Sequence, residues 1–210
     1  MLLQTQNTFS DGKILHVMEE FYSIQGEGFH TGKAAYFIRI GGCDLGCRWC
    51  DVKESWNPKI HQTKAVDKII KNILKCPAKS VVVTGGEPLI YPLDYLCKKL
   101  KENNIQTFLE TSGSHTLSGN WDWICFSPKN NGTAIDNMYK VANELKIIIY
   151  EKCDFKWAEA NVKKINKNCM LYLQPEWSQI NKMLPLIIDY VKQNTKWNIS
   201  LQSHKYMNIP

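Results

Sequence analysis

The chain has 210 residues, a formal net charge of +6, and an ordinary mixture of 44% apolar and 22% charged residues. This length and composition fit one globular domain with a sizeable core. No apolar run reaches the roughly 18 residues of a membrane span, and residues 1–13 lack the basic start and long apolar stretch of a secretory signal. We therefore expect a cytoplasmic location and no membrane partner. The lysines cluster on helix-like stretches at 64–75 and 98–101 without interleaved aromatics, which argues against nucleic-acid binding.

Strand-like and helix-like segments alternate from about residue 33 onward, after an additional early strand predicted at 14–23. Several of the later strands are near-continuous runs of β-branched or aromatic residues, which is typical of strands buried on both faces. In chain order, these predicted strands span 34–40, 80–84, 105–111, 123–126, 145–150, 170–175 and 197–202.

Apolar residues at helical spacing predict helices over 65–75, 93–101, 155–165 and 177–192. Thr63 is the expected cap of the first helix, and Pro185 is expected to kink or split the last one.

Strand–helix alternation of this length predicts right-handed βαβ units and a parallel sheet, either open or curled into a barrel. No internal repeat and no long linker divides the chain, so we expect a single α/β domain over residues 1–210. In such sheets, ligands bind at the carboxyl ends of the strands.

The strongest motif is GGCDLGCRWCD at 41–51, directly after a predicted strand. Its Cys43, Cys47 and Cys50 can ligate three corners of a four-iron cluster and leave the fourth iron open to a small chelating molecule. The amino and carboxylate groups of S-adenosylmethionine suit that open iron. Electron transfer from the cluster into the sulfonium would then cleave a carbon–sulfur bond and produce a 5′-deoxyadenosyl radical.

A zinc site is the alternative for these cysteines, completed by a ligand such as His61 or Cys76. Zinc ligands usually come in paired Cys-x2-Cys or Cys/His units, so the uneven triple favours the iron–sulfur cluster. Eight cysteines in a cytoplasmic chain do not indicate a disulfide framework. The scattered ones are interpreted as small buried side chains or surface thiols: Cys76, Cys97, Cys125, Cys153 and Cys169.

A second motif, VVVTGGEP at 81–88, ends a buried strand at the edge where ligands bind. Gly85 and Gly86 permit close backbone approach, so their carbonyls could accept hydrogen bonds from a ligand ammonium, and Glu87 adds negative charge. Alone, the motif is equally compatible with a tight strand–helix turn.

Together and in this order, the two motifs resemble the radical S-adenosylmethionine superfamily. The resemblance implies that the three cysteines ligate the cluster and that Trp49 lies against the adenine of the cofactor. It also implies further cofactor contacts, from Thr84, Gly85, Gly86, Glu87, Ser112, Ser127 and Lys129.

The flanking segments FYSIQGEGFHTGKAAYFIRIGGC at 21–43, LQPEW at 173–177 and the ending LQSHKYMNIP are similar to the 7-carboxy-7-deazaguanine synthase family. That resemblance spans nearly the whole chain. It implies a shortened, partly open parallel (β/α)6-type barrel, with the C-terminal segment 197–210 closing the active site. It implies substrate contacts from Gln25, Glu27, Arg39, Gln174, His204 and Pro210.

These residue types suit a carboxylated pterin. A carboxylate such as Glu27 can accept from the 2-amino and ring N–H edge, and Gln25 can both donate and accept. Arg39 can pair bidentately with the substrate carboxylate. The structural alternatives are a glycine turn at QGEG and an ion pair of Arg39 with a structural acid.

One position departs from the family. A hydroxyl residue that helps to bind Mg²⁺ often follows Cys-Asp, whereas this chain has Val52 after Asp51. Valine offers no oxygen to a hard cation. Mg²⁺ is therefore expected either to be held by substrate and water, with or without help from Asp51, or to be used weakly.

The resemblance implies conversion of 6-carboxy-5,6,7,8-tetrahydropterin to 7-carboxy-7-deazaguanine in queuosine biosynthesis, by hydrogen abstraction, ring contraction and ammonia loss. It also implies a homodimer and an external electron donor such as a flavodoxin. Two alternatives stay open: an activating enzyme for a glycyl-radical partner, and a zinc-stabilised binding module without catalysis.

Overall fold

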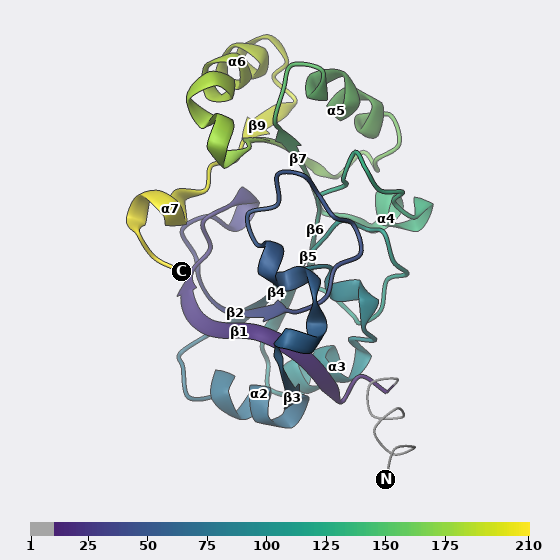
Figure 1. Ribbon diagram of the computed structural model, residues 1–210, viewed down its shortest axis with the longest axis vertical. Coiled ribbons are helices and arrows are strands. Elements are labelled where there is room, and N and C mark those ends of the chain that lie inside the picture. The colour runs from purple at the N-terminus through teal and green to yellow at the C-terminus, as the bar shows by residue number, and fades with distance from the viewer. Residues whose placement is uncertain (1–10) are drawn as a thin grey trace.

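The computed structural model describes residues 11–210, which form one nine-stranded sheet (Figure 1). The expected absence of a secretory signal falls mainly on residues 1–10, which lie outside the described residues. The strands are β1 Ile14–Ile24, β2 Ala34–Ile40, β3 Gln62–Ala65, β4 Ser80–Gly85, β5 Gln106–Thr111, β6 Trp123–Phe126, β7 Glu144–Ile149, β8 Met170–Pro175 and β9 Trp197–Ile199.

The strand order is β3-β1-β2-β4-β5-β6-β7-β8-β9. From β2 to β9, each neighbouring pair is parallel, while β1 runs antiparallel to both β2 and β3. Because β3 and β9 are the two ends of this order, the sheet does not close into a full barrel. The predicted α/β fold with an open, mostly parallel sheet is therefore confirmed.

The helices are α2 Val66–Ile73, α3 Asp94–Glu102, α4 Asp136–Val141, α5 Asp154–Val162, α6 Ile180–Gln193 and α7 Ser203–Met207. Short 3₁₀ turns occupy Gly28–His30, Lys53–Trp56, Pro58–Ile60, Pro88–Ile90 and Trp177–Gln179. Figure 1 shows α5 and α6 at one end of the molecule and α2 and α3 at the other. Among the described residues, no helix is long and apolar enough to cross a membrane.

One local prediction was wrong. Thr63 does not cap α2, because residues 62–65 pair with the start of β1 as an edge strand. The first helical N–H, that of Val66, donates instead to the carbonyl of Lys13 (2.9 Å).

Pro185 does not split the last long helix, because it lies inside a continuous α6. Burial of Met183 and Ile187 in the core helps to offset the usual cost of about 3 kcal/mol for an internal proline.

Side chains on the parallel strands alternate between two environments, as the two-residue period of a strand requires. On β2, Tyr36, Ile38 and Ile40 face the helices and belong to the main core, whereas Ala35 and Phe37 face the inside of the curved sheet. The same alternation places a row of polar side chains on the inner face near the strand ends: Arg39, Thr84, Glu110, Lys146 and Gln174.

The amino-terminal half of the inner face is filled by the 3₁₀ turn Gly28–His30. The Phe29 ring stacks on Trp123 at 4.6 Å, and the His30 ring stacks on Phe108 at 4.2 Å. Glu144 accepts hydrogen bonds from the Phe29 N–H (3.2 Å) and the Trp123 indole (3.1 Å). Only the carboxyl-terminal half of the inner face is therefore left open for a ligand.

The main core is expected to carry most of the stability. Leu109 is fully buried in it, so Leu109→Ala should lower the free energy of unfolding by about 2–5 kcal/mol through the cavity it leaves. Leu74, which is 54% exposed, provides the control, and Leu74→Ala should change stability by only about 0.5 kcal/mol. Urea unfolding measures both; equal effects would contradict this account of the core.

Candidate active site

A cavity of about 250 Å³ opens at the carboxyl ends of the parallel strands. All but one of the side chains and glycines predicted to form the site line it. They are Gln25, Glu27, Arg39, Cys43, Cys47, Trp49, Cys50, Thr84, Gly85, Gly86, Ser112, Ser127, Lys129, Gln174, His204 and Pro210.

The three cysteines of the 41–51 loop share one wall of this cavity. Within the loop, the Cys50 N–H donates to the carbonyl of Cys47 (3.1 Å). Asn131, from the segment after β6, donates to the carbonyl of Leu45 (2.7 Å) and accepts from the Cys47 thiol (3.6 Å). Sequence reasoning missed Asn131, which holds the cluster loop through these two contacts.

Burial raises the pKa of the Cys43 and Cys47 thiols, so a metal is needed to make them thiolates at neutral pH. No three His, Cys, Asp or Glu side chains within residues 11–210 converge on a single ion. In a cuboidal cluster, each thiolate binds a different iron, so the sulfurs need not converge.

The residues that would complete a zinc site are engaged elsewhere. The His61 ring nitrogen Nε2 lies 2.8 Å from the carbonyl oxygen of Glu54, and Cys76 packs against the main core. These contacts speak against zinc at the three cysteines.

The TGGEP segment is joined to the cluster loop through backbone contacts. The Gly86 N–H donates to Ile40 (2.9 Å), and the Glu87 N–H donates to Gly42 (2.8 Å). A Cβ on Gly86 would lie 2.1 Å from the Gly42 carbonyl oxygen. Gly85 has a φ of +129°, and a Cβ there would lie 2.2 Å from the oxygen of Ile40. The two glycines therefore allow β4 to end against the start of the cluster loop while both still line the cavity.

Glu87 is the exception among the predicted site residues, because it does not line the cavity. Glu87 is 1% exposed, and its carboxylate accepts from the Leu89 N–H (3.1 Å), the Thr111 hydroxyl (2.6 Å), and both the N–H (2.8 Å) and the hydroxyl (2.5 Å) of Ser112. Four donors of the protein thus satisfy the charge that was expected to meet a ligand. Glu87 instead fixes the turn after β5 behind the cavity wall.

The wall beside the cysteines carries Trp49, Ser127 and Lys129. The Lys129 ammonium donates to the Ser127 hydroxyl (2.8 Å) and lies 5.5 Å from the centre of the Trp49 ring. Burial lowers the pKa of Lys129, and the neighbouring Cys47 opposes this shift. Lys129 therefore orders an indole ring and a hydroxyl beside the cluster loop.

Gln25 and Thr84 meet at a carboxylate that sequence reasoning missed. Glu110 accepts from the Gln25 amide (2.9 Å) and the Thr84 hydroxyl (2.9 Å). The side-chain oxygen Oε1 of Gln25 accepts from the Glu27 N–H (3.0 Å). The only sign of Glu110 in the sequence is an acidic residue near the end of the predicted strand 105–111.

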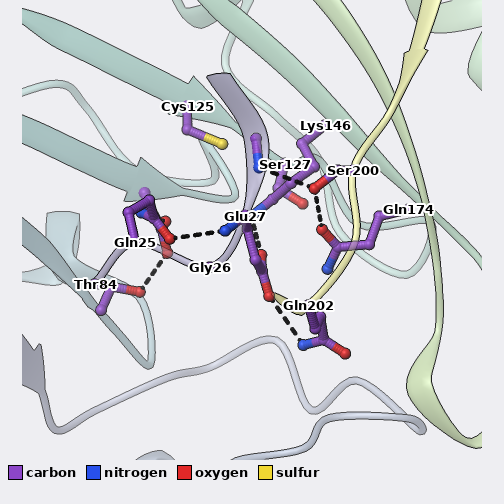
Figure 2. Close-up of polar contacts among 12 residues, drawn as sticks. Gln25, Gly26, Glu27, Thr84, Cys125, Ser127, Lys146, Gln174, Ser200 and Gln202 are labelled. Carbon is purple, nitrogen blue, oxygen red and sulfur yellow. Dashed lines mark hydrogen bonds and ion pairs between the residues drawn. The ribbon is translucent and has the colours of Figure 1, made fainter. Parts of the chain in front are cut away.

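Glu27 is held from two sides (Figure 2). The Lys146 ammonium forms an ion pair with Oε2, and the Gln202 amide donates to Oε1 (2.9 Å). Burial raises the pKa of the Glu27 carboxyl, but Lys146 and then Gln202 outweigh burial and lower it to about 2. Lys146 was also missed, although a single lysine in the buried strand LKIIIY is an unusual residue.

Arg39 forms an ion pair through its Nε with Glu19 (2.6 Å) and also lines the cavity. The structural ion pair considered for this residue is therefore present. This ion pair uses the Nε atom of Arg39, and the terminal amino groups of the guanidinium take no part in it.

The C-terminal segment docks on the QGEG turn. The Ser203 N–H and hydroxyl both donate to the carbonyl of Gly26 (3.0 and 2.8 Å), and the Ser200 hydroxyl accepts from the Gly28 N–H (2.9 Å). The His204 ring packs so closely on Gly26 that a Cβ there would lie 2.2 Å from its Nδ1. Burial lowers the pKa of His204.

Two further contacts complete this side of the cavity. Gln174 accepts from the Ser200 hydroxyl (2.6 Å), and the main-chain oxygen of Pro210 accepts from the Ser23 hydroxyl (3.2 Å). The second contact places the C-terminal residue beside the end of β1 (Figure 1).

Comparison with known proteins shows the family of this chain. Residues 37–168 match the model of the Radical SAM superfamily. The chain is 54% identical to 7-carboxy-7-deazaguanine synthase of Flavobacterium psychrophilum, over 99% of this chain and 98% of that protein. It is 43% identical to 7-carboxy-7-deazaguanine synthase of a Synechocystis species, over 92% of each chain.

The chain belongs to the 7-carboxy-7-deazaguanine synthases of the radical SAM superfamily. The resemblance predicted from the sequence is thereby confirmed, as is the prediction of an enzyme. The crystal structure of QueE from Escherichia coli has a TM-score of 0.81 to this fold at 28% identity, covering 94% of this chain and 98% of that one.

A four-iron cluster and S-adenosylmethionine are the cofactors of this superfamily, and the described residues fit both. Cys43, Cys47 and Cys50 supply three thiols on one wall without a fourth protein ligand. The glycines of the TGGEP segment expose backbone on the adjoining wall, and Trp49 adds an aromatic face.

The position that departs from the family also lines the cavity. Val52 presents only methyl groups there, and the neighbouring Asp51 carboxylate accepts from Gln202 (3.3 Å) and Lys205 (3.2 Å). The two residues that follow Cys50 therefore offer one carboxylate, which the C-terminal segment already engages.

The remaining five cysteines are free thiols outside the cavity. Cys97, Cys125 and Cys169 are buried and Cys153 is exposed, in keeping with their interpretation as small apolar side chains or surface thiols.

The contact of Gly86 with Gly42 provides a test of how the site is assembled. In Gly86→Ala, the new Cβ meets a backbone oxygen of the cluster loop, so we expect the variant to lose most of its bound iron. Gly46→Ala is the control, since its Cβ meets nothing within 4 Å and its φ of +61° costs only about 1 kcal/mol. Iron analysis after anaerobic reconstitution measures both. Full iron content in Gly86→Ala would contradict the proposed junction.

Proposed function

We propose that this enzyme converts 6-carboxy-5,6,7,8-tetrahydropterin to 7-carboxy-7-deazaguanine in queuosine biosynthesis. One observation carries the proposal: a single cavity has the cluster cysteines on one wall and the acceptors and cation expected for a carboxypterin on another. The names of the relatives support the same reaction.

In this proposal, the inner-face residues recognise the two ends of the substrate. Glu27 stays ionised at neutral pH and accepts from the 2-amino and ring N–H edge of the pterin, while Gln25 lies beside it. Arg39 binds the substrate carboxylate with its terminal amino groups while Glu19 holds its Nε. His204, Gln174 and Pro210 complete the enclosure and exclude water.

When bound, the cluster and S-adenosylmethionine supply the radical chemistry that removes a hydrogen atom from the substrate carbon bearing the carboxylate. The chain orients and shields the reactants. Trp49 offers its ring to the adenine, Lys129 steadies that ring, and the TGGEP backbone accepts from the cofactor ammonium. Ring contraction, return of a hydrogen atom to the substrate and loss of ammonia then follow within the same cavity, so the conversion releases only ammonia.

The proposal also includes an external electron donor such as a flavodoxin, a homodimer and a cytoplasmic location. An activating enzyme for a glycyl-radical protein is less well supported, because it needs a groove for a polypeptide. The cavity of this chain is instead lined by Gln25, Glu27 and Arg39, the set expected for a carboxypterin.

Anaerobically reconstituted protein should be brown and should contain about four iron atoms and about four sulfide ions per chain. Incubated with a reductant, S-adenosylmethionine and the carboxytetrahydropterin, it should form the deazaguanine. Cys47→Ala should lose both colour and product, whereas Cys97→Ala, a buried thiol outside the cavity, should keep the colour. Cofactor cleavage without the deazaguanine would keep the superfamily and reject this substrate. A colourless protein with one zinc ion would reject the cluster.

The substitution of valine for a hydroxyl residue at position 52 predicts a weak response to magnesium. Adding Mg²⁺ to chelator-treated enzyme should raise turnover by less than about twofold, because Val52 offers no oxygen to the ion. Val52→Thr should restore a larger stimulation. A several-fold increase with the wild-type enzyme would refute the prediction.

A further inference from the structure

Lys146 is a buried cation that the predicted reaction does not use. It lies on the inner face of β7 with 5% of its surface exposed, and its ammonium points at Glu27 (Figure 2). The carboxylates of Glu110 and Glu144 and the Cys125 thiol also interact with its charge. Burial lowers the pKa of Lys146, but the carboxylates, Glu27 first among them, raise it well above its usual value.

Lys146 and Gln202 divide the Glu27 carboxylate between them. Lys146 takes Oε2, and Gln202 takes Oε1 at 2.9 Å. Each carboxylate oxygen has two acceptor sites, so each keeps one for a ligand. Because both oxygens are held, the plane of the carboxylate is fixed.

The ionisation of Glu27 depends on the same lysine. Burial raises the pKa of this carboxyl, and the Lys146 ammonium is the largest of the influences that lower it. Gln202 and His204 contribute smaller lowering effects. Glu110, in contrast, accepts two hydrogen bonds from Gln25 and Thr84, which satisfy it without a cation.

We propose that Lys146 is a positioning residue: it keeps Glu27 an ionised, oriented acceptor for the amino and ring N–H edge of the substrate. This inference rests on the proposed function for the identity of that substrate. Lys146 acts through Glu27, and its ammonium donates no bond to the pterin.

Measuring substrate binding without turnover tells whether Lys146 positions Glu27 or contacts the substrate itself. The reconstituted enzyme is loaded with S-adenosylmethionine in the absence of a reductant and titrated with the carboxytetrahydropterin by calorimetry. In Lys146→Met, the Kd should rise about 10- to 100-fold, the range for losing a hydrogen bond to a charged group. The double variant Lys146→Met/Glu27→Gln removes both charges, so it should fold well and bind no more weakly than Glu27→Gln alone.

The pH dependence provides a second readout. Without Lys146, burial raises the pKa of Glu27, so the carboxyl becomes protonated toward acid pH, and one of its oxygens then carries an O–H donor that opposes the N–H edge of the substrate. The ratio of the Kd of Lys146→Met to that of wild type should therefore fall as pH rises from about 5.5 to 8. His204 interacts with Glu27 in both proteins, so its titration largely cancels in the ratio. Gln202→Leu, which keeps Lys146, should show a flat ratio.

Thermal stability tests the ion pair independently of any ligand. In wild type, the pKa of Glu27 is lowered to about 2. The lowered pKa therefore adds its full contribution to the free energy of unfolding above the pKa that Glu27 has in the unfolded chain, and this contribution does not change between about pH 5.5 and 8. In Lys146→Met, burial raises the pKa of Glu27 above its value in the unfolded chain, so ionising the buried carboxyl destabilises the folded protein. Stability relative to wild type should therefore fall as pH rises through the same window. The double variant should show no such slope.

These outcomes separate the two proposals. If wild type binds no carboxypterin, the proposed substrate fails, while the stability slope still shows whether Lys146 keeps Glu27 ionised. Fully additive binding losses in Lys146→Met and Glu27→Gln would mean that Lys146 contacts the substrate itself and would overturn the positioning role. A pH-independent Kd ratio in Lys146→Met would overturn it as well.

Discussion

The whole site depends on how the parallel strands β2 and β4 end beside each other. The Gly86 N–H binds the carbonyl of Ile40, and the Glu87 N–H binds that of Gly42, so the cofactor-binding turn and the cluster loop form one backbone unit. Side chains could not lie between them, because even a Cβ at Gly86 would overlap the oxygen of Gly42. The relative placement of the thiols and the exposed backbone is therefore set by main-chain hydrogen bonds rather than by side-chain packing.

The substrate side of the cavity relies on charge rather than on backbone. Three carboxylates in the cavity wall or behind it are each satisfied differently. Glu87 is held by hydroxyl and N–H donors, Glu110 by an amide and a hydroxyl, and Glu27 by an ion pair. An ion pair supplies a full opposite charge, and Lys146 outweighs the effect of burial to lower the pKa of Glu27 to about 2. The substrate-facing carboxylate of Glu27 therefore stays ionised through a partner that lies on a distant strand.

The sequence predicts the parallel strands well because burial on both faces leaves long apolar runs, and it predicts the cavity wall because the motifs follow those strands. Short elements such as α4 and β3 lack enough residues to show a period, so they were missed. The partners of Glu27 were missed for another reason: Lys146 and Gln202 are far from it along the chain, and only the folded sheet brings them together. Glu87 was misplaced because its charge is equally suited to a ligand and to the turn that satisfies it.

The docking of residues 200–204 on the turn at Gly26 has a consequence for biosynthesis of the protein. The contact between Ser203 and Gly26 joins positions 177 residues apart. On the ribosome, the cluster loop and the TGGEP turn are synthesised long before residue 203, so the cofactor half can assemble while the chain is still growing. The substrate half can form only after the last helix has emerged. Maturation of the pocket is therefore ordered in time, with metal insertion able to precede enclosure of the substrate site.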